Sequence, residues 1–459
     1  MLNEAPVATQ IMNTIASLHA SFTNGSDNVT ELVARQTARV ADPMGEGARA
    51  FLSLDQDAVV RAADTAQQRI KSGGARPLEG ITVSIKDLFD VKDEVTGAGS
   101  TVLRSRPAAS EDCPAVARLR GAGAIIFGRN NMVEFAYSGI GINPHFGTPR
   151  NVWGRTAGGG GRVPGGSSSG GGVAVADGMA VAALGSDTGG SVRLPAALNG
   201  VCGFKPTAVR VPVVGAIPLS VTHDSVGPIA NSVDCCARID AVLAGGVYTP
   251  SPRRLLRGVR MLKPNSLLWR ELDPEVESSV NAAVEKLQDA GVEIIEAPLA
   301  LLDELLGRPG LVAAEALDWH NANINVNGEG YDPRVWLRMQ TGRDVARGQY
   351  SAALAYRRFW IDRMNIALAG FDAVVCPTVA CIAPEIAPLV ADNALFFKAN
   401  ARILRNTAWV NFMDGCALTM PCHTPGDAPV GLQLVGLHGR DHAILALGLA
   451  CEAALLVVN

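Results

Sequence analysis

The sequence has few aromatic residues, no long apolar run, no block of like charge and no spaced cysteine motif. Phe, Trp and Tyr together form 5% of its 459 residues, so we expect no broad aromatic platform for a ligand. No apolar stretch reaches roughly 18 residues without glycine or charge, which argues against a membrane-spanning helix. The formal net charge is −4 and no basic patch occurs, so nucleic acid is not expected as a direct partner.

The nine cysteines are scattered from Cys113 to Cys451, and none shows the spacing of a zinc site. We therefore expect reduced thiols and no bound metal. The first residues, MLNEAPVATQ, lack the basic start and apolar stretch of a signal peptide, which favours a cytoplasmic location.

Glycine and serine are concentrated in residues 165–207, which read GGSSSGGGVAVADGMAVAALGSDTGGSVRLPAALNGVCGFKPT. Two loops of small residues, one around Ser167 and one ending at Ser191, are separated by an Ala/Val run. Glycine permits backbone conformations that other residues avoid and lets a ligand approach the main chain closely. A flexible linker would not alternate with buried alanine and valine, so the stretch predicts a backbone-lined pocket on a rigid support.

Helices and then a short strand are predicted before this stretch. Apolar residues recur at helical spacing within 7–72. At 79–90, EGITVSIKDLFD, the run ITVSI predicts a buried strand with Lys86 at its end. Such a lysine either extends to solvent or is desolvated, and desolvation lowers its pKa so that it can act as a base. A neighbouring carboxylate, from Asp87 or Asp90, would instead favour the charged form.

Strands and helices alternate through much of the remaining chain. Residues 112–137 predict a helix, a glycine turn and a strand. Further strands are expected at 258–262, 292–299, 372–378, 417–422 and 430–436. The glycine run 158–161 lacks a following GK[ST] and is interpreted as a mobile surface loop. Because later strands can complete a sheet begun earlier, we expect no clean division into domains.

A serine nucleophile needs a base to take its proton and donors to stabilise the oxyanion. Histidine is the usual base, but none of the seven histidines lies in the Gly/Ser stretch. GSSSG at 166–170 matches the G-x-S-x-G elbow, yet it follows a loop instead of a buried strand, which disfavours that motif. A neutral Lys86 could accept a proton through a serine hydroxyl, which both donates and accepts. The turn SDTGGS, 186–191, would then supply N–H groups to the oxyanion.

The Gly/Ser stretch and the upstream GITVSIKDLFD resemble the amidase signature enzymes. The spacing fits too, since 191 − 167 = 24 residues separate the two matching serines. The likeness continues more thinly through GAIIFGRNNMVEFAYS, HDSVGPIANSVDCC and PVGLQLVG. It implies an α/β fold, a large mixed twisted sheet with helices on both faces. It also implies one domain over 1–459, with N-terminal helices at 7–72, a catalytic core at 79–240 and a C-terminal α/β completion at 255–459.

Carried over to this sequence, the resemblance implies that Ser191 is the nucleophile and Lys86 the base. Ser167 would be the bridging serine, with a cis peptide bond to Gly166. The oxyanion-hole N–H groups would come from Thr188, Gly189, Gly190 and Ser191. The residues expected to support these loops are Ser168, Asp187 and Arg193. No metal or cofactor is implied.

The sequence departs from the family pattern in two places. The segment WGRTAGGGGRVPGG is longer than the usual turn and has Val152 where proline is common, which affects the pocket rim. Residues 170–172 are all glycine where serine or alanine is frequent, which affects local packing. The residues expected to line a substrate pocket, each of which also fits an ordinary core position, are Met132, Tyr137, Ser138, Ile140 and Phe146.

The resemblance implies hydrolysis of a C–N bond by acyl transfer to Ser191. The family acts on amides, ureas, carbamates and esters, so a urethanase or an aryl acylamidase fits, and we expect a small or medium amide-type substrate. An alternative is the glutaminase subunit of a tRNA-dependent amidotransferase, which works in a complex. A third class is a non-catalytic protein that binds phosphate through its glycine loops. The oligomeric state stays open, with a homodimer among the options.

Overall fold

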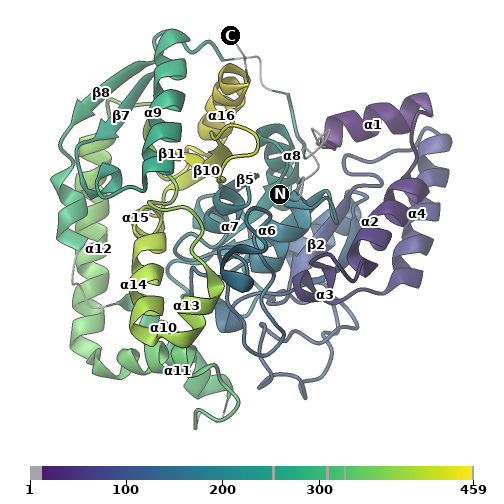
Figure 1. Cartoon of the computed structure of the whole chain (residues 1–459), viewed down its shortest axis with the longest axis horizontal. Helices are drawn as coiled ribbons and strands as arrows, with labels where there is room; N and C mark the ends of the chain where they lie inside the picture. The colour runs from purple at the N-terminus through teal and green to yellow at the C-terminus, as the bar shows by residue number, and fades with distance from the viewer. Residues whose placement is uncertain (1–12, 251–253, 306–309, 325–326, 457–459) are drawn as a thin grey trace.

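The computed structural model describes residues 13–250, 254–305, 310–324 and 327–456. These residues form one eleven-stranded mixed sheet surrounded by helices (Figure 1). The strands are β1 (Phe51–Ser53), β2 (Thr82–Lys86), β3 (Ile125–Asn130), β4 (Ala182–Asp187), β5 (Cys202–Lys205), β6 (Ser225–Ala230), β7 (Arg260–Pro264), β8 (Glu293–Ala297), β9 (Ala373–Pro377), β10 (Cys416–Pro421) and β11 (Gly431–Gly436).

Helices precede and connect these strands. The α-helices are α1 (Ile15–Asn24), α2 (Val29–Ala41), α3 (Gly47–Ala50), α4 (Gln56–Lys71), α5 (Pro114–Gly121), α6 (Ser169–Ala176), α7 (Arg193–Leu198), α8 (Val233–Leu243), α9 (Pro274–Asp289), α10 (Leu311–Asn323), α11 (Pro333–Gln340), α12 (Arg347–Leu368), α13 (Ile386–Ala391), α14 (Asn393–Leu404), α15 (Ala408–Met413) and α16 (Asp441–Leu455). The short 3₁₀ turns are η1 (Glu134–Ala136), η2 (Ala157–Gly159), η3 (Ala208–Arg210), η4 (Leu267–Trp269), η5 (Ala300–Leu305) and η6 (Thr341–Asp344).

The sheet joins strands from both halves of the chain. Its order is β1-β3-β2-β4-β6-β5-β10-β11-β9-β7-β8. β2 runs parallel to both of its neighbours, β3 and β4, whereas β4 pairs antiparallel with β6. β5 pairs with β10, so the strands near the C-terminus extend the sheet begun near the N-terminus. In Figure 1 the helices α1, α2 and α4 lie at the right-hand end of the molecule, and β7, β8 and α9 lie at the opposite end.

The predicted strands and N-terminal helices are confirmed. Each later strand begins within two residues of the predicted position. The runs of Val, Leu and Ala in β9, β10 and β11 are buried inside the sheet, whereas β8, at its edge, is partly exposed. The predicted helical region 7–72 contains α1 to α4 and also the short strand β1, which was not predicted, and residues 7–12 lie outside the described part. α4 begins where the Asp55 side chain accepts the Ala58 N–H, which satisfies one free donor of the first turn.

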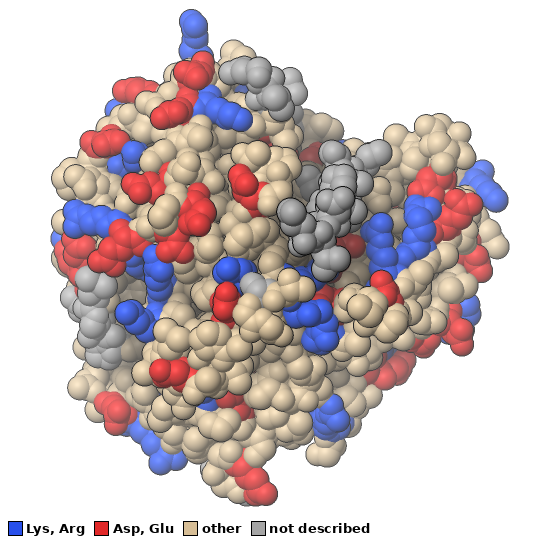
Figure 2. Space-filling view, in the orientation of Figure 1, with Lys and Arg blue, Asp and Glu red and all other residues tan. Residues whose placement is uncertain are grey.

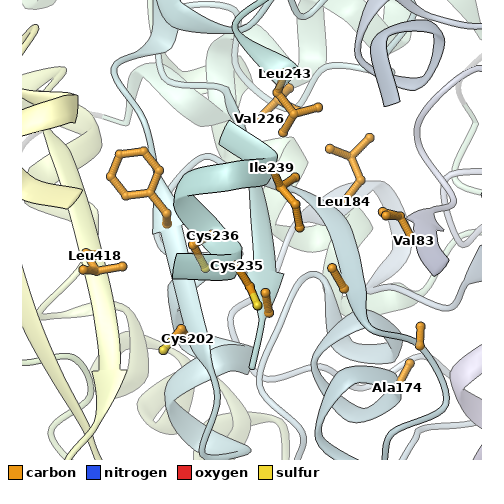
Figure 3. Close-up of a cluster of buried hydrophobic side chains, with 14 of the residues drawn as sticks. Val83, Ala174, Leu184, Cys202, Val226, Cys235, Cys236, Ile239, Leu243 and Leu418 are labelled. Carbon is orange, nitrogen blue, oxygen red and sulfur yellow. The ribbon is translucent and has the colours of Figure 1, made fainter. Parts of the chain in front are cut away.

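Alternating residues of β4 pack against helices on opposite faces of the sheet. Leu184 belongs to a large buried cluster with Val83, Val226 and Ile239, in which α8 covers the sheet (Figure 3). The preceding residue, Ala183, packs in a separate cluster on the other face with residues of α6 and α7. This alternation follows from the two-residue side-chain period of a strand. Both faces are therefore covered at the centre of the sheet, which makes β4 a rigid support.

All nine cysteines are unpaired thiols, as predicted, and eight of them are buried. Cys202, Cys235 and Cys236 pack as small apolar side chains in the cluster of Figure 3. The glycine run at 158–161 forms part of the turn η2 and the loop after it, where Gly158, Gly159 and Gly161 have positive φ.

Charge is distributed without a dominant sign on the face drawn in Figure 2, where Lys and Arg alternate with Asp and Glu. Across the described ranges, none of the helices combines the length and the hydropathy that a bilayer crossing requires.

Candidate active site

The predicted catalytic residues meet at the carboxyl ends of two neighbouring parallel strands. Lys86 is the last residue of β2, and Ser186 is the last but one of β4. The turn from Thr188 to Ser191 follows β4, and Ser167 lies just before α6. Ligands of open α/β sheets bind at the carboxyl ends of their strands, because loops and helix starts converge there. The fold therefore brings together three segments that are distant in sequence.

Lys86 is buried and donates to two hydroxyl groups. The residue is 1% exposed, and its Nζ atom lies 2.8 Å from Ser167 Oγ and 2.8 Å from Ser186 Oγ. Burial lowers the pKa of Lys86 to about 7, although the carboxylates of Asp187 and Asp224 act to raise it. A substantial share of the amine is thus neutral near pH 7.

The acidic residues next to Lys86 in sequence are engaged elsewhere. Asp87 accepts the Arg129 Nε–H at 2.7 Å, and Asp90 accepts the Thr96 hydroxyl at 2.5 Å. No carboxylate of the described residues forms an ion pair with Lys86. The local argument for a permanently charged lysine therefore does not apply.

The first Gly/Ser loop adjoins the second through its main chain. The peptide bond between Gly166 and Ser167 is cis, as the resemblance implied. The Gly166 N–H donates to the Gly139 carbonyl at 2.8 Å, and the Ser168 N–H donates to the Ser191 carbonyl at 3.3 Å. Ser191 is 4% exposed, and its hydroxyl makes no hydrogen bond with any described residue. The Ser191 hydroxyl is therefore not held by another group of the described residues.

Asp187 and Arg193 hold the second Gly/Ser loop, which ends at Ser191, in place. The Asp187 carboxylate accepts the N–H groups of Gly190 at 2.8 Å and Val192 at 3.1 Å. Arg193 binds the same carboxylate through Nε at 3.0 Å and Nη2 at 2.9 Å. Both residues are 0% exposed. Burial acts to raise the pKa of Asp187, but the Arg193 guanidinium holds it well below its usual range.

Arg193 also links this loop to the C-terminal part of the chain. Its Nη1 donates to Gln433 Oε1 at 2.8 Å, and its Nη2 donates to Asn411 Oδ1 at 2.7 Å. A planar guanidinium with five donors can join one carboxylate to two amides in this way. The predicted supporting roles of Asp187 and Arg193 thus have a geometric basis.

The four predicted oxyanion donors differ in their availability. The Gly190 N–H donates to the Asp187 carboxylate, so it points toward Asp187 and is not available to an oxyanion. The N–H groups of Thr188, Gly189 and Ser191 make no hydrogen bond with the described residues. Gly190 has a φ of +133°, and a Cβ at this position would lie 2.3 Å from Thr407 Oγ1. Only glycine fits there, because a side chain would displace the turn.

Ser168 is buried, and its hydroxyl oxygen has no hydrogen-bond partner in the described structure. The residue contributes to the loop contact through its main chain, by the bond to the Ser191 carbonyl.

The five predicted pocket residues lie in several environments. Met132 is 0% exposed in the large core, and Ile140 is 0% exposed in a cluster with Leu194. The Ser138 hydroxyl donates to Asn400 Oδ1 at 3.0 Å. Tyr137 lies beneath Arg338, whose guanidinium carbon is 4.4 Å from the ring centroid. Phe146 is half-buried beneath Arg104, at 4.5 Å.

A small cavity of about 40 Å³ adjoins the site, and none of those five residues lines it. Its wall is apolar apart from three polar residues, and it consists of Leu88, Ala136, Ser186, Val213, Ala216, Ile217, Pro218, Leu219, Val221, Asp224, Ser225 and Val226. A larger cavity of about 480 Å³ lies at the start of β9 and the end of β11, and Lys86, Ser167 and Ser191 do not line it. The smaller cavity is therefore the one connected with Lys86, through Ser186.

Sequence reasoning missed two residues of this site. Ser186 stands beside Asp187 in SDTGGS, and the parallel pairing of β2 with β4 would have placed it near Lys86. Asp224 lies in HDSVGPIA, directly before a buried strand, but nothing in the sequence indicates that this loop reaches Thr188. Across the described ranges, no group of His, Cys, Asp and Glu has the arrangement of a metal site.

Comparison with known proteins agrees with this geometry. A family model described as Amidase matches residues 31–445, so the chain belongs to the amidase family, the amidase signature enzymes. It is 35% identical over 389 residues to 2-amino-5-chloromuconic acid deaminase of Comamonas testosteroni, covering 82% of each chain. It is 32% identical over 481 residues to a subunit of the glutamyl-tRNA(Gln) amidotransferase of Symbiobacterium thermophilum, covering 96% of each. A crystal structure of an amidase superposes with a TM-score of 0.85 at 31% identity, covering 96% of this chain and 99% of that one.

Fold, site and family together define a hydrolase that acts on amides. The expected mixed α/β architecture of the amidase signature enzymes is confirmed.

Proposed function

We propose that this enzyme cleaves a C–N bond by acyl transfer to Ser191, with Lys86 as the base and Ser167 as the bridge between them. The observation that carries the proposal is the environment of Lys86. Its amine is buried, pairs with no carboxylate of the described residues, and lies 2.8 Å from the Ser167 hydroxyl. A desolvated lysine of this kind is a competent general base.

The first half-reaction transfers one proton along the hydroxyls. Ser191 Oγ attacks the substrate carbonyl carbon and forms a C–O bond while its proton passes to Ser167 Oγ. The Ser167 proton passes to Lys86 Nζ, which becomes an ammonium. The same chain then returns a proton to the leaving nitrogen as the C–N bond breaks, and an acyl-enzyme remains. Water enters by the reverse path and releases the acid.

The developing oxyanion needs donors that are in place before the reaction. Because the Gly190 N–H is occupied, the proposed oxyanion hole consists of the N–H groups of Thr188, Gly189 and Ser191. Preorganised donors of this kind lower the barrier without reorganisation during the reaction. Ser168, Asp187 and Arg193 would keep the two loops in this arrangement.

Labelling with a fluorophosphonate probe tests the proposed nucleophile. We expect the wild type to be labelled at Ser191 and Ser191→Ala to lose both labelling and turnover, since no other hydroxyl occupies that position. Ser169→Ala is the matched control: its hydroxyl is buried at 3.4 Å from the Asn131 carbonyl, outside the relay, and labelling should persist. Labelling of Ser191→Ala at the wild-type rate would refute the assignment.

A positive charge beside the site favours a substrate that bears a carboxylate. Arg338, in α11, is half-buried, and burial lowers the pKa of its guanidinium. It donates to the Tyr137 carbonyl but pairs with no carboxylate of the described residues. Tyr137 is two residues from Gly139, which holds Gly166. An incompletely paired guanidinium suits bidentate binding of a carboxylate.

We expect Arg338→Met to raise KM for an amide that carries a carboxylate by about 10- to 100-fold, since a hydrogen bond to a charged group is lost. KM for an uncharged aryl amide should change much less. Arg334→Met on the same helix is the control, because Arg334 binds Asn393 and the Val390 carbonyl at the surface. Equal effects on both substrates would exclude this role, and a steady-state assay of the two amides decides it.

The two relatives suggest different settings for the same chemistry. The name of the deaminase supports an enzyme that acts on a small acid. The likeness to the amidotransferase subunit supports the glutaminase alternative, in which the chain would act within a complex. Size-exclusion chromatography combined with glutamine and aryl-amide assays separates the two, because a glutaminase subunit would hydrolyse glutamine poorly alone.

Further features complete the proposal. One sheet that spans both halves of the chain supports a single amidase signature domain over 1–459. Nine unpaired thiols support a reducing compartment, hence a cytoplasmic enzyme. The proposed pocket still includes the segment around Met132, Tyr137, Ser138, Ile140 and Phe146, supported by Ala136 in the wall of the smaller cavity.

A further inference from the structure

Asp224 connects the turn from Thr188 to Ser191, the oxyanion turn, with the loop that precedes β6. One carboxylate oxygen, Oδ1, accepts the Thr188 hydroxyl at 2.5 Å. The other, Oδ2, accepts the N–H groups of Leu219 at 3.0 Å and Ser220 at 3.1 Å. No cation of the described residues forms an ion pair with Asp224. The carboxylate is satisfied by neutral donors alone, so its charge is left to act on its surroundings.

The positive group whose charge acts on Asp224 is Lys86. Ser186 accepts a hydrogen bond from Lys86 Nζ, and Ser186 and Asp224 line the same small cavity. The two ionisable groups attract each other across this space: Asp224 acts to raise the pKa of Lys86, and Lys86 acts to lower that of Asp224. Burial nevertheless raises the pKa of Asp224 to about 6.

Other charges around the pair are accounted for. Asp187, whose charge also acts on Lys86, is bound by Arg193. Lys205, in β5, donates to two main-chain carbonyls. His223, beside Asp224, stays neutral because burial lowers its pKa to about 3. Asp224 is therefore the carboxylate near Lys86 that no arginine or lysine neutralises within the described residues.

We propose that Asp224 is a positioning residue of this active site, with two effects that can be separated. Its hydrogen bond orients Thr188 at the start of the oxyanion turn, and its negative charge stabilises the ammonium that Lys86 becomes when it takes the serine proton. The inference rests on the relay proposed above.

The hydrogen bond matters because two of the four residues of the oxyanion turn are glycines. Gly189 and Gly190 have no side chains to hold their peptide planes. Asp187 fixes the turn from one side through the Gly190 N–H, and Asp224 fixes it from the other through the Thr188 hydroxyl. Together they determine where the N–H groups of Thr188 and Gly189 point.

The charge matters because proton transfer creates an ammonium in a site of low polarity. An opposite charge nearby stabilises the protonated amine and brings a buried lysine back toward the pH at which a general base works best. Without it, burial alone would leave Lys86 a weaker base. The cost of forming the ammonium would then appear in the rate of acylation.

Two nearly isosteric substitutions separate the effects. In Asp224→Asn the amide oxygen can accept the Leu219 and Ser220 N–H groups, and the amide nitrogen can donate to the Thr188 hydroxyl, so the contacts persist and the charge is lost. In Thr188→Val the hydroxyl is lost and the charge persists. The measurements are kcat, KM and the pH profile of kcat/KM for an aryl amide, together with the rate of fluorophosphonate labelling.

We expect Asp224→Asn to lower kcat about 10-fold and to move the acid limb of kcat/KM down by about one pH unit, because the pKa of Lys86 falls when the carboxylate charge is removed. Thr188→Val should also lower kcat about 10-fold, through the misplaced oxyanion donors, while the limb stays where it is in the wild type. KM should change little in either variant. Asp224→Glu, which restores the charge, should return the limb toward its wild-type position.

An acid limb that does not move in folded Asp224→Asn would overturn the electrostatic role. A kcat unchanged in Thr188→Val would overturn the orienting role. If Asp224→Asn does not fold, Asp224→Ser removes the same charge, and an acid limb that stays at its wild-type position in that variant contradicts the electrostatic role. Absence of Ser191 labelling in the wild type would instead refute the relay itself.

Discussion

Two buried lysines, Lys86 and Lys205, occupy neighbouring parts of the same sheet but have different partners. Each is 1% exposed and ends a strand, β2 and β5 respectively. Burial lowers the pKa of Lys86 to about 7 and that of Lys205 to about 8. Lys86 donates to the hydroxyls of Ser167 and Ser186, whereas Lys205 donates to the carbonyls of Pro206 at 2.8 Å and Gly415 at 2.7 Å.

The difference shows that burial alone does not make a lysine a base. A carbonyl oxygen only accepts, so the partners of Lys205 never offer it a proton. A hydroxyl can rotate and donate, so Lys86 has a suitable partner in both protonation states. The shared loss of hydration depresses both pKa values, but of the two lysines only Lys86 contacts hydroxyl groups, whose protons are exchangeable. Lys205 instead joins β5 to the end of α15.

Substituting each lysine by methionine gives the largest contrast. We expect Lys86→Met to lower kcat and the rate of probe labelling on the order of 10³-fold, because the general base is removed. Lys205→Met should lower the free energy of unfolding by about 1–3 kcal/mol, since two buried carbonyls lose their donor. Its turnover per folded molecule should stay within about threefold of the wild type.

Active-site titration with the fluorophosphonate probe, combined with thermal unfolding, measures both quantities. If Lys205→Met lost as much turnover per folded molecule as Lys86→Met, the distinction drawn from their acceptors would be wrong. A folded Lys86→Met enzyme with wild-type labelling would remove Lys86 from the mechanism.

The positions of the strands could be predicted from the sequence, but their order could not. The run ITVSI is apolar throughout because β2 is buried on both faces, and this pattern is visible without a structure. Nothing in the runs at 202–205 and 416–421 shows that β5 and β10 are neighbours. Pairing between strands that lie so far apart in the sequence depends on the packing of the whole sheet.

The proposed relay residues could be predicted through the family resemblance, whereas their electrostatic surroundings could not. The sequence places the acidic residue Asp87 beside Lys86, but in the fold the Asp87 carboxylate binds Arg129, from β3. Asp224 and Arg338 come from segments whose sequences carry no sign of their proximity to the site. These contacts arise from tertiary packing, which short-range patterns do not record.

The pH dependence of activity tests the same comparison with the smallest expected effect. The pKa of Lys86, about 7, predicts that kcat/KM falls as the pH drops below 7, because the ammonium form cannot accept a proton. We expect a loss of about tenfold on going one pH unit below that pKa. Initial rates between pH 5 and 9 measure the acid limb of the pH profile of kcat/KM. The limb should be unchanged in Lys205→Met, since Lys205 lies outside the proton path. An activity that is independent of pH on the acid side, or a limb that moves with Lys205, would show that Lys86 does not control the reaction.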